Sequence, residues 1–224
     1  MGGYDEPVSG YWHVYSDGKR ADIPFDTDRD KTYAMNSVAI CAYFLDMEVV
    51  CSEVNDTHLH SILKGREGRA LQKSLQTRIC RYDNACKPAS RGRILFSADP
   101  ISSRTELLNK IIYTFRNCLD FYRGAPWNYK WGVGNIFFAP RKEEGMPISS
   151  LTVRERERLL GTRKALPETW RVNESGLILP ASYINAEAVE RLFGSVKAFL
   201  AFLYLRKDDE QKIKQQINRD YMEA

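Results

Sequence analysis

The chain has 224 residues, which suits one ordinary domain with an appendage or two small domains. A hydrophobic fraction of 43% and a charged fraction of 28% predict a soluble globular protein, and 12% aromatic residues exclude a disordered chain. The net charge of +4 is compatible with a nucleic-acid partner but does not require one.

Membrane-spanning and secreted classes are not expected. The sequence has no run of about eighteen apolar residues, the length that a transmembrane helix needs. Its first residues lack the pattern of a signal peptide. Five cysteines, without a Cys-x-x-Cys pair, disfavour a disulfide framework and a structural zinc site. We therefore expect a reducing cytoplasm as the location.

The hydrophobic pattern predicts an alternation of strands and helices. In chain order these are a strand at 11–16, a helix at 30–45, strands at 47–54 and 57–63, a helix at 66–82, a strand at 93–98 and a helix at 103–123. The two residues Asn55 and Asp56 predict an antiparallel hairpin. Ser103 and Glu106 have capping-box spacing. The order predicts an α+β fold, with a ferredoxin-like β-α-β-β-α-β core and an antiparallel sheet.

The remainder of the sequence predicts a helical appendage. Residues 139–150 resemble a linker, a helix begins at Ser150, a longer helix covers Asn185 to Arg206, and residues 211–224 form a polar tail. We therefore divide the chain into a domain at 1–140, which carries the motifs described next, and an appendage at 141–224. The appendage would be a small DNA-binding unit or a lid on the first domain.

Histidine occurs only three times, at His13, His58 and His60. His58 and His60 lie two residues apart in a predicted strand, so both imidazoles project from one face. Such a pair can ligate one metal ion, but a three-residue motif is weak evidence by itself. The alternative is two half-exposed strand histidines. For His13 we expect an ordinary strand histidine with satisfied hydrogen bonds.

The polar side of the predicted helix 103–123 carries Tyr113 and Asn117, together with Asn109, Arg116 and Asp120. The apolar face is filled, at about 100° per residue, by Leu107, Leu108, Ile111, Ile112, Phe115, Cys118, Leu119 and Tyr122. Tyr113 and Asn117 lie off this face, side by side at i and i+4. Tyr113 is either a surface tyrosine or a nucleophile presented away from the core. Asn117 could supply a third metal ligand beside it.

Four segments, in order, resemble the single-tyrosine HUH transposases, and among them the REP-associated tyrosine transposases. His58-Leu59-His60 resembles their histidine-hydrophobic-histidine strand, and Tyr113-Thr114-Phe115-Arg116-Asn117 resembles their Tyr-x-x-Arg-Asn helix segment. Two more segments resemble their first strand and the stretch after the helix: Trp12-His13-Val14 with Gly18, and Trp127-Asn128-Tyr129-Lys130-Trp131. Order and spacing agree over residues 10–138.

The resemblance implies a reaction. In this family two histidines and a polar helix residue, here His58, His60 and Asn117, bind Mg²⁺ or Mn²⁺, which polarises a phosphate of single-stranded DNA. The tyrosine, here Tyr113, forms a 5′-phosphotyrosine link and releases a 3′-hydroxyl. The resemblance thus implies a cytoplasmic, nucleoid-associated DNA transposase with single-stranded or hairpin DNA as partner. It is compatible with a homodimer and leaves open whether the site is built in cis or in trans.

Basic side chains near these motifs are the predicted DNA contacts, because each could neutralise a backbone phosphate. They are Lys64, Arg66, Arg69, Lys73, Arg104, Lys110 and Arg116. Trp127 or Tyr129 could stack on unpaired bases. For any single cation the alternative is a solvated helix face, and Trp127 and Trp131 are equally compatible with core positions.

Three positions depart from the family pattern. Thr57 replaces the usual Asn before the first histidine, Cys118 replaces the Pro that commonly follows the helix Asn, and Asp17 replaces a frequent Arg. None of these changes removes a ligand or the nucleophile. Three functions remain open: a metal-dependent strand transferase, an inactive relative that binds hairpin or single-stranded DNA, and a structural or protein-interaction domain.

Overall fold

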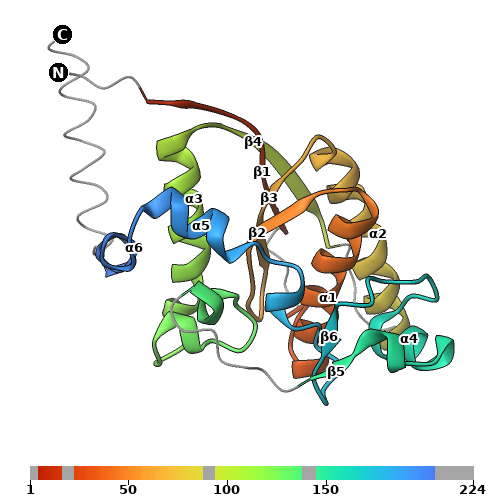
Figure 1. Cartoon of the computed structure of the whole chain (residues 1–224). Helices are drawn as coiled ribbons and strands as arrows, with labels where there is room; N and C mark the ends of the chain where they lie inside the picture. The colour runs from red at the N-terminus through yellow and green to blue at the C-terminus, as the bar shows by residue number, and fades with distance from the viewer. Residues whose placement is uncertain (1–4, 17–22, 88–93, 138–144, 205–224) are drawn as a thin grey trace, which may run out of the picture.

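A four-stranded antiparallel sheet forms the centre of the molecule (Figure 1). The computed structural model describes residues 5–16, 23–87, 94–137 and 145–204. In the sheet order β2-β3-β1-β4, the strands are β1 (Pro7–Ser16), β2 (Glu48–Val54), β3 (Leu59–Lys64) and β4 (Phe96–Ser103). The helices that alternate with and follow them are α1 (Asp28–Phe44), α2 (Gly68–Cys86) and α3 (Arg104–Arg116). The predicted α+β class is confirmed, and these elements follow one another in the predicted order.

The sheet separates two helical layers (Figure 1). α1 and α2 lie on one face, and α3 lies on the other. Trp12 of β1 meets Gly68 of α2, while His60 of β3 meets Tyr113 of α3. Successive strand residues point to opposite faces of the sheet. Each strand therefore directs apolar side chains toward α1 and α2, and its alternate side chains toward α3.

The strand register gathers polar side chains on the face under α3. Tyr15 of β1 pairs with His60 of β3, and Glu53 of β2 pairs with the same histidine from the other side. Paired residues of antiparallel strands project to the same face. His13, two residues before Tyr15, therefore shares this face with His60 and Glu53.

Several predicted strand boundaries are wrong, and β1 already begins at Pro7 instead of residue 11. β4 passes through Pro100 to Ser103, whereas the sequence predicts a strand at 93–98 that ends near the proline; residues 88–93 lie outside the described part. β4 is an edge strand, and an edge tolerates a residue without an N–H. β3 begins at Leu59, so His58 belongs to the connection at 55–58 and not to the strand itself.

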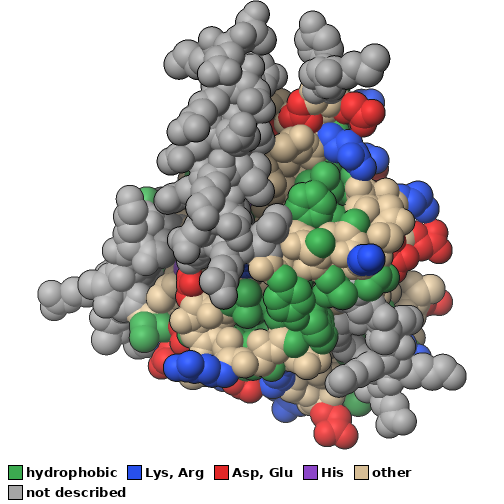
Figure 2. Space-filling view, turned by 90° about the vertical axis from the view of Figure 1, so that its left-hand side faces the viewer, with side chains coloured by type: hydrophobic (Ala, Val, Ile, Leu, Met, Phe, Trp, Pro, Cys, Tyr) green, Lys and Arg blue, Asp and Glu red, His purple; other side chains and the backbone are tan. Residues whose placement is uncertain are grey.

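The C-terminal residues pack on α3 and contribute to the main hydrophobic core. The predicted helix at 185–206 is two helices, α5 (Ala186–Phe193) and α6 (Val196–Tyr204), separated at Gly194, whose φ of 72° suits glycine. Phe193, Phe199 and Leu203 are buried with the sheet residues. Figure 2 faces this side of the molecule, where hydrophobic side chains gather. The predicted tail at 211–224 lies outside the described residues, and the division at residue 140 stays a prediction.

The predicted linker at 139–150 is structured where it is described. β5 (Met146–Pro147) pairs with β6 (Arg171–Val172), and α4 (Val153–Leu160) starts at a capping box made by Thr152 and Glu155. Residues 138–144 lie outside the described part. In the described ranges, the helices are too short or too polar to span a bilayer.

Gly68 allows the close contact between α2 and β1, which generates the first prediction. A Cβ atom at Gly68 would overlap the indole ring of Trp12, whose Nε1 donates to the carbonyl of Gly65 at 3.1 Å. Alanine favours a helix by about 1 kcal/mol over glycine, but overpacking costs about 1–3 kcal/mol. We expect Gly68→Ala to lower the free energy of unfolding by about 1–2 kcal/mol in urea titrations.

The control is Ser74→Ala at an exposed position of the same helix. It should be neutral or slightly stabilising, because it changes helix propensity without changing a contact. A Gly68→Ala variant that is as stable as Ser74→Ala would contradict the close contact with Trp12.

Candidate active site

Helix α3 starts at the predicted cap. The Ser103 Oγ accepts a hydrogen bond from the backbone N–H of Glu106 at 3.2 Å. The Glu106 carboxylate accepts from the backbone N–H of Ser102 at 3.0 Å, one residue before the position that a reciprocal capping box would use. The cap therefore fixes the start of the helix that carries Tyr113.

The end of α3 differs from the prediction. The helix stops at Arg116, and Asn117–Asp120 forms a 3₁₀ turn (η1), whereas the apolar pattern predicts a helix up to Arg123. The tighter turn rotates the following residues relative to the α-helical stripe. Leu119, which the pattern places on the buried face, is consequently 40% exposed.

Tyr113 lies outside the buried face of α3, as the sequence predicts. Its side chain is 48% exposed, whereas Ile111 and Phe115 on the stripe are buried. Its ring meets the ring of His60 edge-on, with 5.1 Å between centroids and 86° between planes. The tyrosine is thus held beside a histidine of the sheet while much of its surface stays open to solvent.

Three amide atoms converge on one nitrogen of His58. The Nε2 atom lies 3.1 Å from the Oδ1 and 2.9 Å from the Nδ2 of Asn117. The Nδ2 of Asn55 is also 3.1 Å from this nitrogen. A ring nitrogen carries either one proton or one lone pair, so it can satisfy only one of them at a time. More amide atoms of Asn117 and Asn55 therefore surround the Nε2 of His58 than this nitrogen can bind at one time.

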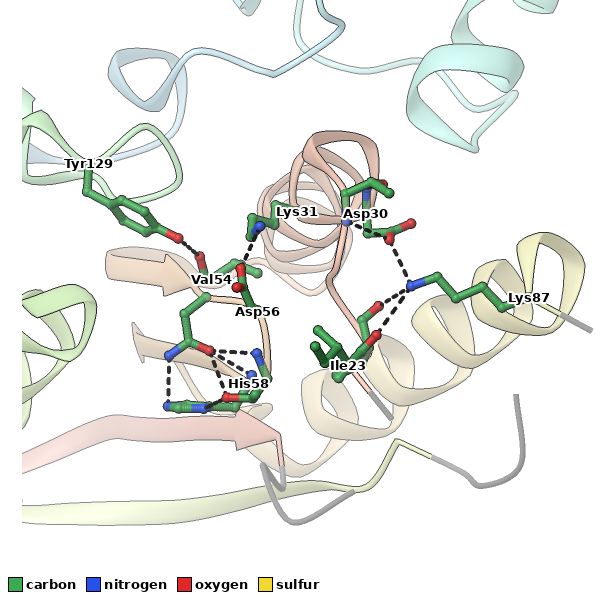
Figure 3. A network of polar contacts seen from close by, with 12 residues as sticks. Ile23, Asp30, Lys31, Val54, Asp56, His58, Lys87 and Tyr129 are labelled. Carbon is green, nitrogen blue, oxygen red and sulfur yellow. Dashed lines mark hydrogen bonds and ion pairs between the residues drawn. The ribbon is translucent and has the colours of Figure 1, made fainter. Parts of the chain in front are cut away.

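The loop at 55–58 is organised by Asn55, which the sequence analysis did not single out. Its Oδ1 accepts from the backbone N–H groups of Thr57 at 3.0 Å and His58 at 2.8 Å (Figure 3). The sequence could have indicated this role, because an asparagine directly after a strand commonly caps a turn with its side chain. Thr57, one of the departures from the family pattern, contacts the Nδ1 of His58 through its hydroxyl at 2.7 Å.

His60 is buried, and one of its nitrogens faces His13. The Nδ1 of His60 lies 3.0 Å from the Nε2 of His13, and the two rings stack at 15°. Burial holds the pKa of His60 well below its usual range, with help from the nearby His13, His58 and Lys110. Burial and then the charge of Lys110 lower the pKa of His13 to about 4. Both imidazoles are therefore neutral at pH 7, the form that ligates metals.

His58, His60 and Asn117 offer two imidazoles and an amide oxygen, which are donors that a divalent cation accepts. Adjacent ligands of an octahedral ion with bonds of about 2.1 Å lie about 3 Å apart, and the Nε2 of His58 lies 3.1 Å from the Oδ1 of Asn117. The rings of His58 and His60 are 4.8 Å apart and nearly perpendicular. Within the described ranges no cluster of three His, Cys, Asp or Glu residues could hold a metal. An ion at this place would therefore depend on the amide oxygen.

The chain is similar in structure to a REP-associated tyrosine transposase bound to a REP hairpin. The similarity covers 61% of this chain and 85% of that chain, at 12% sequence identity and a TM-score of 0.46. No protein-family profile matches the sequence, and no curated protein sequence matches it. A similarity at this level assigns neither a family nor an activity to the chain.

Glu53 is a buried carboxyl group beside the histidines that the sequence analysis did not single out. It is 1% exposed and pairs with His60 across the β2–β3 ladder. Burial raises its pKa well above the usual range, and hydrogen bonds from the thiol and backbone of Cys118 oppose this rise. Because Cys118 follows Asn117 directly, Glu53 attaches turn η1 to the sheet. The sequence feature that could have indicated it is an acidic residue directly before the last apolar residue of a mostly apolar strand.

The three predicted DNA-binding residues of α3 differ in their surroundings. Lys110 is close enough to the histidines to lower the pKa of both His13 and His60. Arg104 donates to the backbone carbonyl of Leu192 at 2.6 Å, so it attaches α3 to α5. Arg116 is half-buried at the end of the helix. Of these, Lys110 places a positive charge close to the two buried histidines.

The other four predicted DNA-binding residues lie away from Tyr113. Lys64 is at the opposite end of β3 from His60, with its ammonium group 5.5 Å from the ring centroid of Tyr11. Arg66, Arg69 and Lys73 are exposed just before or on α2, in the layer across the sheet. The chain crosses to the other face of the sheet after β3, which separates these cations from Tyr113, and their role as DNA contacts stays a prediction.

Tyr129 is a core residue and does not stack on bases in this conformation, contrary to one of the expectations. It is 6% exposed, and its hydroxyl donates to the carbonyl of Val54 at 2.9 Å (Figure 3). Trp127 and Trp131 are half-buried and pack against the main core. The stretch after α3 therefore supports the end of β2 and the start of the loop that carries His58.

The raised pKa of Glu53 generates a pH prediction. The folded state binds the carboxyl proton of Glu53 more tightly than the unfolded state does. The protonated carboxyl group therefore contributes its full stabilisation at pH values below the unfolded pKa of about 4.3. The effect is lost as the pH rises toward the folded pKa. Glu53→Gln cannot ionise. We expect this variant to gain stability relative to the wild type between pH 4 and pH 8, measured by urea unfolding at each pH.

Glu168→Gln serves as the control, because Glu168 is exposed. Its difference in stability from the wild type should stay constant with pH. If the difference for Glu53→Gln also stays constant, the carboxyl group is not held in its protonated form by the fold.

Proposed function

We propose that this protein is a metal-dependent DNA strand transferase of the single-tyrosine HUH type, a transposase that nicks and rejoins single-stranded or hairpin DNA. The observation that carries the proposal is the edge-on contact between the exposed Tyr113 and the buried, neutral His60. The pair formed by His58 and Asn117 lies one helical turn away. The resemblance of the two site motifs to that family supports the same assignment.

In this proposal the chain supplies a nucleophile and a cation site. His58, His60 and Asn117 would hold Mg²⁺ or Mn²⁺, which would withdraw charge from a phosphate oxygen. The Oη of Tyr113 attacks phosphorus, and the phosphorus–O3′ bond breaks as the Oη–phosphorus bond forms. The phenol proton is lost, the leaving 3′ oxygen gains one, and the 5′ end of the DNA remains on Tyr113. Attack by the 3′-hydroxyl of another strand reverses these steps and completes the transfer.

The contacts within one chain favour a site built in cis. The Tyr113 ring already touches His60 of the same chain, and Asn117 touches His58 of the same chain. A homodimer is compatible with this arrangement, but it need not exchange the tyrosine helix. The proposal also includes the fold class, since the sheet order β4-β1-β3-β2 and the β-α-β-β-α-β chain order support a ferredoxin-like core.

The nucleophile is tested by Tyr113→Phe with single-stranded hairpin DNA and Mn²⁺. Loss of the phenol oxygen removes the only atom that can form the tyrosine ester. We expect the wild type to form a covalent adduct visible on a denaturing gel. The variant should form at least about 100-fold less adduct. DNA affinity should change little. Tyr43→Phe is the matched control, because Tyr43 is 45% exposed on α1, across the sheet, and should keep full adduct formation.

Each other outcome has a distinct meaning. An adduct formed by Tyr113→Phe at the wild-type level would show that another residue is the nucleophile. Hairpin binding by the wild type without any adduct would replace the proposal with a DNA-binding relative that has lost its chemistry. If the wild type has no salt-dependent DNA affinity, the protein is a structural or protein-interaction domain.

Lys110 and Lys73 provide a test of where DNA binds. Lys110 lies on α3 close to the histidines, whereas Lys73 lies on α2 across the sheet. We expect Lys110→Ala to weaken binding of single-stranded DNA and to reduce the slope of log affinity against log salt by about 0.7, the contribution of one phosphate contact. Lys73→Ala should leave both unchanged. Fluorescence anisotropy at several salt concentrations measures the two quantities, and equal effects of the two variants would contradict this placement.

A further inference from the structure

His13 is a buried histidine that the proposed chemistry does not use. Its side chain is 3% exposed, and its Nε2 lies 3.0 Å from the Nδ1 of His60. The other nitrogen of His13, Nδ1, is buried and has no hydrogen-bond partner among the described residues. The structure therefore contains a buried pair of imidazoles joined through one nitrogen of each ring.

A hydrogen bond between two neutral imidazoles needs one N–H donor and one lone-pair acceptor. If the Nε2 of His13 donates, His60 carries its own proton on Nε2 and has no lone pair left for a cation. If the Nδ1 of His60 donates, the Nε2 of His60 keeps its lone pair and can coordinate. The direction of this one hydrogen bond thus decides whether His60 can be a ligand.

His13 is the acceptor that the second arrangement requires. Among the described residues, the ring of His60 has its hydrogen-bond partner in His13. The ring stack at 15° and the pairing of β1 with β3 hold the two nitrogens in place. A metal-binding histidine commonly donates its second N–H to a neighbouring acceptor, which fixes the ring and its tautomer. In this chain a second imidazole occupies the place that is more often taken by a carboxylate or a carbonyl.

We propose that His13 is a positioning residue, whose Nε2 accepts a hydrogen bond from the Nδ1 of His60 and so presents the Nε2 of His60 to the cation. This inference rests on the proposed function, because it takes His60 to be a ligand. It also assigns the proton of His13 to Nδ1, the atom without a partner among the described residues. His13 itself touches neither the cation nor the DNA.

The test compares two substitutions of His13 in the full chain, with Mn²⁺ alone as the probe. His13→Leu keeps a comparable volume but removes the acceptor. His13→Gln keeps an acceptor oxygen at about the position of Nε2. We expect His13→Leu to weaken Mn²⁺ binding by about 10- to 100-fold, the usual effect of losing such a partner. His13→Gln should recover most of that loss. Electron paramagnetic resonance of free Mn²⁺ gives both dissociation constants.

A second measurement uses the wild type, so it does not depend on whether a variant folds. In ¹⁵N-labelled protein saturated with the diamagnetic Mg²⁺, the ¹⁵N NMR signals of the rings should show that His60 carries its proton on its Nδ1. They should show that His13 also carries its proton on its own Nδ1. A proton on the Nε2 of His60 in the loaded protein would overturn the inference.

The binding outcomes separate this inference from the proposed function. Wild-type protein that binds no Mn²⁺ would overturn both the cation site and the role of His13. Wild-type binding that His13→Leu leaves unchanged would overturn the role of His13 alone. Equal weakening by the leucine and glutamine variants would also overturn it, because packing and not the hydrogen bond would then be responsible.

Discussion

The packing of α3 across the sheet is the constraint on which the candidate site depends. The buried stripe of this helix fixes its rotation, so that Tyr113 faces His60 at one edge of the stripe. The 3₁₀ turn that follows brings Asn117 to His58, and Glu53 attaches this turn to β2 through Cys118. The same burial that stabilises the fold therefore sets the distances among the phenol, the two imidazoles and the amide.

Burial also sets the charge state of the site. Removing His60 and His13 from water disfavours their protonated forms, and Lys110 disfavours them further. A cation bound as proposed would thus meet uncharged nitrogens instead of imidazolium groups. Lys110 adds a positive charge on the helix that carries Tyr113, where a DNA phosphate would arrive in the proposed reaction. The exposed cations of α2 lie across the sheet and are separated from this chemistry.

Much of the fold could be predicted from the sequence, because hydrophobic periodicity and helix caps are local. The order of strands and helices, the start of α3 at Ser103 and the position of Tyr113 outside the apolar stripe all follow from spacing along the chain. Predictions failed where distant contacts overrule local preference. The end of α3 meets His58 through Asn117, and the strand through Pro100 pairs with β1, so both involve residues far away in the sequence. The break at Gly194 is different, because it is a local glycine cap that the apolar pattern does not reveal.

For the site, the sequence by itself determined which chemical groups are available: two histidines at i and i+2, and a tyrosine and an asparagine at i and i+4. Only the tertiary structure decided which of these meet, and it added His13, Asn55 and Glu53 to their surroundings. In the tertiary structure, Arg66, Arg69 and Lys73 lie before or on α2, which is across the sheet from Tyr113. The reason is that strand register and the crossing of the chain between layers are set by the whole core, and no short segment encodes them.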